Sequence, residues 1–172
     1  NDTRINYRFR KNKKLKYKVR FQNNGEGPAT TIKLNVETPG IIDKSTLEVL
    51  DMYPQCKICP DMEVSYSCLD TVLMEDHISF IFKNIYLPGS NQKGVDAYDS
   101  TKGFVKYSVK LKKKAEKINS SSRTAIIFDK NEPIMTNYAK TYFKPGLSIG
   151  AKAGYRSIGE LKNSRDYFFG IT

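Results

Sequence analysis

The chain has no tryptophan, a single histidine and only three cysteines among its 172 residues. With His77 as the one histidine, no convincing Ser-His-Asp triad or pair of catalytic carboxylates can be assembled. No stretch approaches the roughly 18 consecutive apolar residues that a membrane-spanning helix needs. We therefore expect no enzyme, no cofactor and no transmembrane helix.

The residues that are present favour β-structure. Tyrosine and phenylalanine together supply 12% aromatic residues, and aromatic residues suit half-buried pleated surfaces. The length allows one sandwich of ordinary size with an appendage. The chain begins at Asn1 and stops within a predicted strand at Thr172, so we expect it to be a piece of a larger protein.

Strict alternation of apolar and polar residues predicts the strands. Residues 15–21 place Leu15, Tyr17, Val19 and Phe21 on one face and cationic side chains on the other, as expected for a half-buried antiparallel strand. Similar runs follow within 31–36, 77–83, 103–111 and 124–129, whereas 90–102 reads as a loop. These runs predict an all-β, Ig-like antiparallel β-sandwich over 15–137, after a basic lead-in over 1–14. The predicted core consists of Tyr17, Val19, Phe21, Ile32, Leu34, Phe80, Phe82, Tyr107, Val109 and Ile127.

Several separated motifs carry a resemblance to a known family. They are Leu15-x-Tyr17-x-Val19-Arg20-Phe21-Gln22-Asn23-Asn24-Gly25, Ser45-Thr46-Leu47, Asn84-Ile85-x-Leu87-Pro88-Gly89, Gly103-Phe104-Val105-x-Tyr107, and the run from Thr124 to Asn137. In this order the motifs resemble the conserved-repeat, Ig-like domain near the ends of surface proteins exported by the bacterial type IX secretion system. The resemblance implies a sandwich, an extracytoplasmic location and a spacer, stalk or adhesion role without catalysis.

The chemistry of these motifs agrees with roles in folding. Asn24-Gly25 predicts a tight turn with a positive φ, and Pro88-Gly89 predicts a sharp strand end. Asp129 and Asn131 can bond the backbone of their own turn.

The cysteines allow three interpretations. Cys56, Cys59, Cys68 and His77 have the spacing C-x2-C-x8-C-x8-H, which offers enough ligands for a tetrahedral zinc ion. Cys56 and Cys59 could also form a redox pair, although no βαβ pattern surrounds them. An exported domain more often oxidises its thiols. We therefore predict a disulfide between Cys68 and either Cys56 or Cys59, with no metal site and the third thiol left over or paired elsewhere.

The formal net charge of +11 comes largely from lysines in two runs, 8–18 and 110–117. Such a charge attracts nucleic acid, anionic lipid or acidic polysaccharide. A simpler interpretation is that lysines keep edge strands soluble and unpaired, and we favour it. Nucleic acid is not an expected partner because no recognition helix is evident. The residues we single out for polyanion contact are Lys112, Lys113 and Lys114.

Two further sites could be assembled from the sequence, but neither is expected. Lys16 or Lys18 could form an isopeptide bond with Asn137, but both lysines lie on a polar strand face, whereas that chemistry needs a buried lysine. Asp96, Asp99 and Asp129 could supply oxygens to calcium, but their spacing matches no known loop, and solvated turn residues are the simpler reading.

Residues 138–172 are predicted to form a linker and a β-hairpin, the possible start of a further domain. Leu147, Ile149, Ala151, Ala153 and Tyr155 alternate with polar or small residues. The pattern resembles the first hairpin of an outer-membrane barrel, although a soluble hairpin explains it as well. We expect the hairpin to protrude from the sandwich, where residues 147–172 could contact a membrane.

The function we expect is that of a non-catalytic structural or adhesive module of a secreted or cell-surface bacterial protein. Its partner would be a protein or a cell-envelope component. One alternative is the extramembrane part of an outer-membrane assembly whose barrel begins near residue 147. A second alternative is a polyanion-binding module.

Overall fold

The computed structural model of the chain describes residues 3–6, 14–95, 97–112, 119–144, 151–157 and 165–171, with side chains described for 14–95, 97–112 and 119–143. The secondary structure is almost entirely strand, with one short 3-10 helix, η2 (Tyr98–Thr101), within the described residues. The first half of the chain forms β1 (Thr3–Asn6), β2 (Lys14–Gln22), β3 (Ile32–Glu37), β4 (Ile42–Tyr53), β5 (Lys57–Ile58), β6 (Cys68–Leu73) and β7 (His77–Lys83). The second half forms β8 (Lys102–Leu111), β9 (Ser120–Ser122), β10 (Thr124–Phe128), β11 (Ile134–Met135), β12 (Ala139–Lys144), β13 (Ala151–Ser157) and β14 (Arg165–Ile171).

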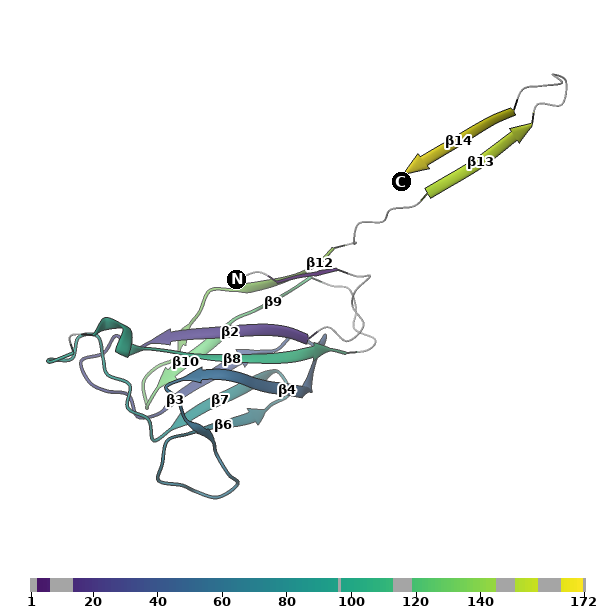
Figure 1. Ribbon diagram of the computed structural model, residues 1–172. Helices are drawn as coiled ribbons and strands as arrows, with labels where there is room; N and C mark the ends of the chain where they lie inside the picture. Colours follow the sequence, from purple (N-terminus) through teal and green to yellow (C-terminus); the bar gives the residue numbers. More distant parts are fainter. Residues whose placement is uncertain are drawn as a thin grey trace.

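Two sheets pack face to face and enclose the core (Figure 1). One has the strand order β11-β10-β3-β7-β6-β5, and the other has the order β2-β8-β4. Aromatic rings join the layers: the Phe80 and Tyr107 ring centroids lie 5.0 Å apart, and the Phe21 ring lies edge-on to Phe82 and Phe128. The predicted all-β sandwich is therefore confirmed, with antiparallel pairing throughout these two sheets except between β5 and β6.

The predicted core is confirmed at most positions. The side chains of Phe21, Ile32, Leu34, Phe80, Phe82, Tyr107 and Val109 are buried, while Tyr17 and Val19 are half-buried against them. The prediction for Ile127 is wrong, because β10 buries Ile126 and Phe128 instead. These two pair with Leu34 and Ile32 of β3 and share their inward face. The run 125–128 is apolar at every position, so its alternation could not reveal which residues face the core.

Segments that the sequence left irregular also form structure. β6 follows the cysteine-rich stretch and pairs with β7. The segment 90–102, predicted as a loop, contains η2 and the fully buried Thr101. The boundary predicted at residue 137 falls between β11 and β12, and β12 pairs with β9 and in parallel with β1 to form a third sheet. Phe143 of β12 belongs to the core cluster.

β13 and β14 pair antiparallel, with Ala151 opposite Ile171 and Ser157 opposite Arg165. The predicted apolar row of this hairpin includes Leu147 and Ile149, which lie outside the described residues, as do the side chains of β13 and β14. The protruding arrangement and the barrel alternative therefore stay predictions. No helix among the described residues is long and apolar enough to cross a membrane.

Candidate functional site

The two turn motifs of the first part of the chain dock against each other at one end of the sandwich. The Asn23 side-chain amide donates to the carbonyls of Gly27 and Leu87, and its oxygen accepts from the Gly25 amide. A Cβ at Gly89 would lie 2.2 Å from the Gly25 carbonyl oxygen, so only glycine fits there. The positive φ predicted for Asn24-Gly25 is wrong, because neither residue has one. The turn instead requires a close approach between Gly25 and Gly89.

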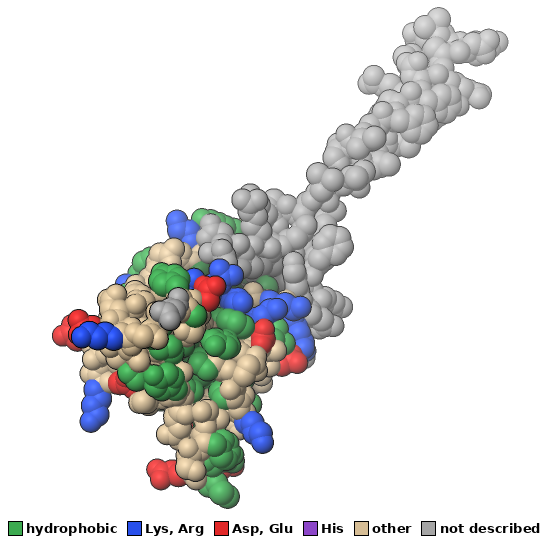
Figure 2. Space-filling model, turned by 60° about the vertical axis from the view of Figure 1, so that its left-hand side comes forward, with side chains coloured by type: hydrophobic (Ala, Val, Ile, Leu, Met, Phe, Trp, Pro, Cys, Tyr) green, Lys and Arg blue, Asp and Glu red, His purple; other side chains and the backbone are tan. Residues whose placement is uncertain are grey.

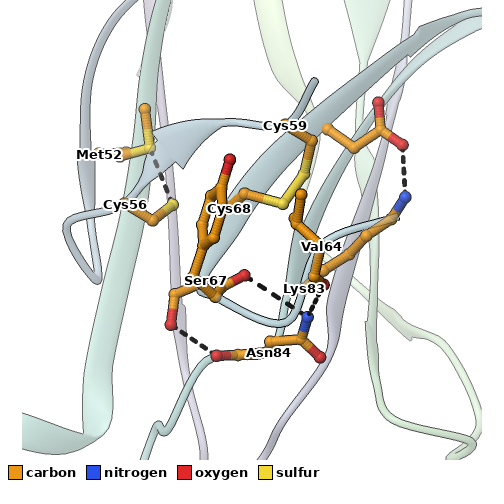
Figure 3. Close-up of a disulfide and its surroundings, with 10 residues drawn as sticks. Met52, Cys56, Cys59, Val64, Ser67, Cys68, Lys83 and Asn84 are labelled. Carbon is orange, nitrogen blue, oxygen red and sulfur yellow. Dashed lines mark hydrogen bonds and ion pairs between the residues drawn. A yellow bond between two sulfur atoms is a disulfide. The ribbon is translucent and has the colours of Figure 1, made fainter. Parts of the chain in front are cut away.

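A loop over 59–68 is closed at its base by a disulfide between Cys59 and Cys68 (Figure 3). This pairing is one of the two predicted for Cys68. Residues 57–58 form β5, whose Lys57 and Ile58 pair in parallel with Cys68 and Leu69. The Cys59 amide also donates to the Leu69 carbonyl. The base of the loop thus continues the six-stranded sheet.

Asn84 holds the second half of the same loop, residues 64–67. Its side-chain amide donates to the Val64 carbonyl over 2.8 Å, while its own carbonyl accepts from the Ser67 hydroxyl (Figure 3). Asn84 has a φ of 52°, in the left-handed region that asparagine tolerates better than most residues. The disulfide therefore fixes the base of the loop, and Asn84 fixes its second half.

The side chains between these anchors point outward. Met62 is 74% exposed and Tyr66 48%, with Asp61 and Glu63 exposed beside them. Ile58, just before the loop, is 55% exposed. Figure 2 shows hydrophobic and acidic side chains together on the lowest part of the molecule, where this loop lies in Figure 1. A groove of about 630 Å³ lies beside the loop, lined among others by Pro60, Met62, Val64, Asp70 and Lys83. The loop offers an apolar contact surface with an acidic border.

The third cysteine is separate from this disulfide. Cys56 is a half-buried free thiol whose sulfur lies 3.4 Å from Met52 Sδ, and Figure 3 shows it directed toward that residue. Burial raises the pKa of the Cys56 thiol, which disfavours the reactive thiolate. With Cys59 and Cys68 bonded to each other, neither the zinc interpretation nor a Cys56-Cys59 redox pair fits this structure.

The remaining residues weighed from the sequence do not gather into one site. His77 begins β7, where its Nδ1 lies 2.6 Å from Asp76 Oδ1. Asp99 pairs with Lys102. Asp129 accepts hydrogen bonds from the Thr30 and Thr31 amides, so it bonds the start of β3 rather than its own turn. The described residues include no cluster of three or more histidine, cysteine, aspartate or glutamate residues that could hold a metal ion.

The structure describes only some of the residues considered for an isopeptide bond, for polyanion contact and for calcium. Lys16 and Lys18 are exposed on the outer face of β2, as expected from their place in the alternation. Lys112 is exposed just after β8, and its amide donates to the Ile41 carbonyl. Lys113 and Lys114 lie outside the described residues, as does Asp96 of the calcium candidates.

A family model described as a domain of unknown function (DUF7619) matches residues 2–142. The matched region starts before β1 and ends within β12, so it includes both core sheets and the loop over 59–68. No curated protein and no solved structure matches the chain.

Proposed function

We propose that this chain, which belongs to the DUF7619 family, is a non-catalytic structural or adhesive module of a secreted or cell-surface bacterial protein. In this proposal the loop over 59–68 contacts a protein partner. The observation that carries the proposal is that this loop is fixed at its base and along its second half, while Met62 and Tyr66 of the loop, and Ile58 just before it, remain open to solvent.

A loop held in one conformation loses little conformational entropy when it binds, so its contact area is converted into affinity more efficiently. Methionine and tyrosine are enriched at protein interfaces, where methionine adapts its shape and tyrosine combines an apolar ring with a polar tip. Apolar side chains gathered on one exposed loop, with acidic residues beside them, fit a contact with another protein better than a solvated turn.

The disulfide indicates an oxidising, extracytoplasmic environment. Secretion or display at the cell surface is the finer part of the proposal. It is supported by the resemblance of the sequence motifs to the Ig-like domain of type IX exported proteins. The mutual docking of the Asn23 and Gly89 turns gives those motifs a common role in folding.

The loop contact can be tested by immobilising an envelope protein fraction of the source bacterium. Beads that carry the purified 172-residue chain are passed over this surface, and the number of beads retained is measured. The variant with Met62→Ser and Tyr66→Ser should lose retention at least tenfold. The matched control with Met74→Ser and Tyr86→Ser removes the same residue types at other exposed positions, and it should retain binding. Equal retention of both variants, or retention that survives protease treatment of the fraction, would contradict the protein contact.

The location can be tested separately on cells that express the parent protein. A membrane-impermeant protease added to intact cells should cleave the chain, and a thiol reagent should label Cys56 alone until the disulfide is reduced. Full protection from the protease, together with three labelled cysteines before reduction, would place the chain in a reducing compartment.

A further inference from the structure

The outer face of the β2-β8-β4 sheet gathers cations that are far apart in the sequence. β2 contributes Lys14, Lys16, Lys18 and Arg20, and β8 contributes Lys102, Lys106 and Lys110. Their registered pairs place them side by side on the face opposite the core. On the side of the molecule turned to the viewer in Figure 2, Lys and Arg side chains lie among hydrophobic and acidic ones. We call this outer surface of β2 and β8 the cationic face.

Like charges stand directly opposite each other on this face. Lys18 pairs with Lys106, and Lys14 pairs with Lys110. Such cross-strand pairs destabilise a sheet by mutual repulsion. β2 is an edge strand, where lysines prevent pairing with another chain. β8 is the central strand of the same sheet and needs no such protection. Edge protection therefore does not explain Lys106 and Lys110.

Acidic residues neutralise only part of this charge. On the other side of β8, β4 places Asp43 opposite Lys110, Glu48 opposite Ser108 and Asp51 opposite Lys106. Among the described residues the ion pairs on this face are Lys14 with Glu48 and Lys102 with Asp99. Consistently, Lys14 holds the pKa of Glu48 below its ordinary value. Among the described residues, Lys16, Arg20 and Lys106 take part in no ion pair.

Aromatic rings lie among the cations at one end of the face. Phe104 stands between Arg20 and Tyr53 in the strand register, and the Lys18 Nζ lies 3.5 Å from the centroid of the Phe104 ring. Tyr53 is exposed. A hollow of about 540 Å³ opens here, lined among others by Lys18, Arg20, Tyr53, Lys102 and Phe104.

We infer that the cationic face binds an anionic polysaccharide. This ligand would bind away from the loop over 59–68, so the inference goes beyond the proposed function. Lysine and arginine bond carboxylate or sulfate groups, and the exposed ring of Tyr53 offers a flat surface to the C–H face of a sugar. The cations of β2 follow one another at about 7 Å along the strand, so they form a row suited to a linear polymer. The extracytoplasmic environment indicated by the disulfide favours polysaccharide over nucleic acid.

The inference is tested with the full chain and four probes: heparin, polygalacturonate, a single-stranded oligonucleotide and vesicles of anionic lipid. The variant with Lys16→Gln, Lys18→Gln and Lys106→Gln should bind both polysaccharides at least tenfold more weakly. The slope of log Kd against log salt should fall by about 2 to 3, because three charge contacts are lost. Its thermal midpoint should change little, because the repulsion between Lys18 and Lys106 is lost together with the Lys18 contact to Phe104 and the charge opposite Asp51.

A matched control removes the same charge from elsewhere on the sandwich, with Lys33→Gln, Lys57→Gln and Lys130→Gln. Lys33 lies in β3, Lys57 in β5 and Lys130 in the turn after β10. The control should lose less than about threefold in affinity. Tyr53→Leu should weaken polysaccharide binding about threefold or more without changing the salt slope, because it removes a ring and no charge.

Three results would overturn the inference. The first is a control variant that loses as much affinity as the variant of the cationic face. The second is loss of binding on changing Lys112, Lys113 and Lys114 to Gln while the face variant still binds. The third is tighter binding of the oligonucleotide, or of vesicles of anionic lipid, than of either polysaccharide.

Discussion

The side-chain amide of Asn23 donates a hydrogen bond of 3.0 Å to the carbonyl of Leu87, 64 residues further along the chain and away from solvent. The same amide group holds the Gly27 carbonyl. Asn23 therefore bridges two turns, and the backbones that it joins approach closely enough to exclude a side chain at Gly89.

Gly89→Ala should lower the free energy of unfolding by about 3 kcal/mol, because the new methyl group meets the backbone of Gly25 and the turns must separate. Gly27→Ala is the control within the same turn, where a Cβ meets nothing within 4 Å; it should change stability by less than about 1 kcal/mol. Urea unfolding of both variants measures the difference. Equal stabilities would show that the turns are not packed as described.

Phe80→Ala should cost about 3–5 kcal/mol, enough to unfold a marginally stable domain. Its ring is fully buried and contacts the Tyr107 ring of the opposite sheet. Far-ultraviolet circular dichroism during urea titration gives the value. A loss below about 1 kcal/mol would mean that this ring does not join the two sheets.

Ile126→Ala and Ile127→Ala should differ, because neighbouring residues of β10 face opposite sides. Ile126 is 7% exposed within the core cluster, and its truncation should cost about 2–4 kcal/mol. The half-buried Ile127 lies on the outer side, and its truncation should cost about 1 kcal/mol or less. Thermal denaturation measures both losses. A larger loss for the Ile127 variant than for the Ile126 variant would support the inward-facing Ile127 expected from the sequence.

Replacing Cys59 and Cys68 together by serine should lower stability by about 2–3 kcal/mol, since the unfolded chain is no longer constrained by a short closed loop. Cys56→Ala leaves the disulfide intact and should cost less than about 1 kcal/mol. Guanidinium titration without reductant distinguishes them. If the Cys56 variant were the less stable one, the disulfide assignment would be wrong.

The domain should lose stability in alkali. Burial, and secondarily the neighbouring Tyr17, raises the pKa of Tyr107 above its ordinary value. The folded protein therefore holds this proton more tightly than the unfolded chain, whose tyrosines ionise near pH 10. The contribution to stability is complete below about pH 10 and declines as the pH rises further.

Tyr107→Phe should reduce this alkaline loss, whereas Tyr66→Phe at an exposed ring should leave it unchanged. Burial also raises the pKa of Tyr17, so part of the loss should remain in the Tyr107 variant. Unfolding free energies between pH 8 and pH 12 provide the comparison. Identical profiles for the two variants would exclude Tyr107 as the source.

The alternation of apolar and polar residues was sufficient to predict the core-facing side chains of strands in which it is strict. In β2 and β8 it predicted which side chains enter the core, because a strand turns successive side chains to opposite faces. It also indicated that the lysines of β2 face outward. The disulfide was predicted from the cysteines and the expected location, but with two partners open for Cys68.

The tertiary structure decided what depends on pairing between distant segments. Nothing local to 124–128 distinguishes Ile126 from Ile127, and only the register with β3 turns Ile126 inward. Cys59 rather than Cys56 meets Cys68 because β5 aligns beside β6. The cations of β2 and β8 share one face because Lys18 and Lys106 meet in a single register. A sequence specifies such registers only through the packing of the whole core, since shifting one strand by one residue would expose all of its apolar side chains.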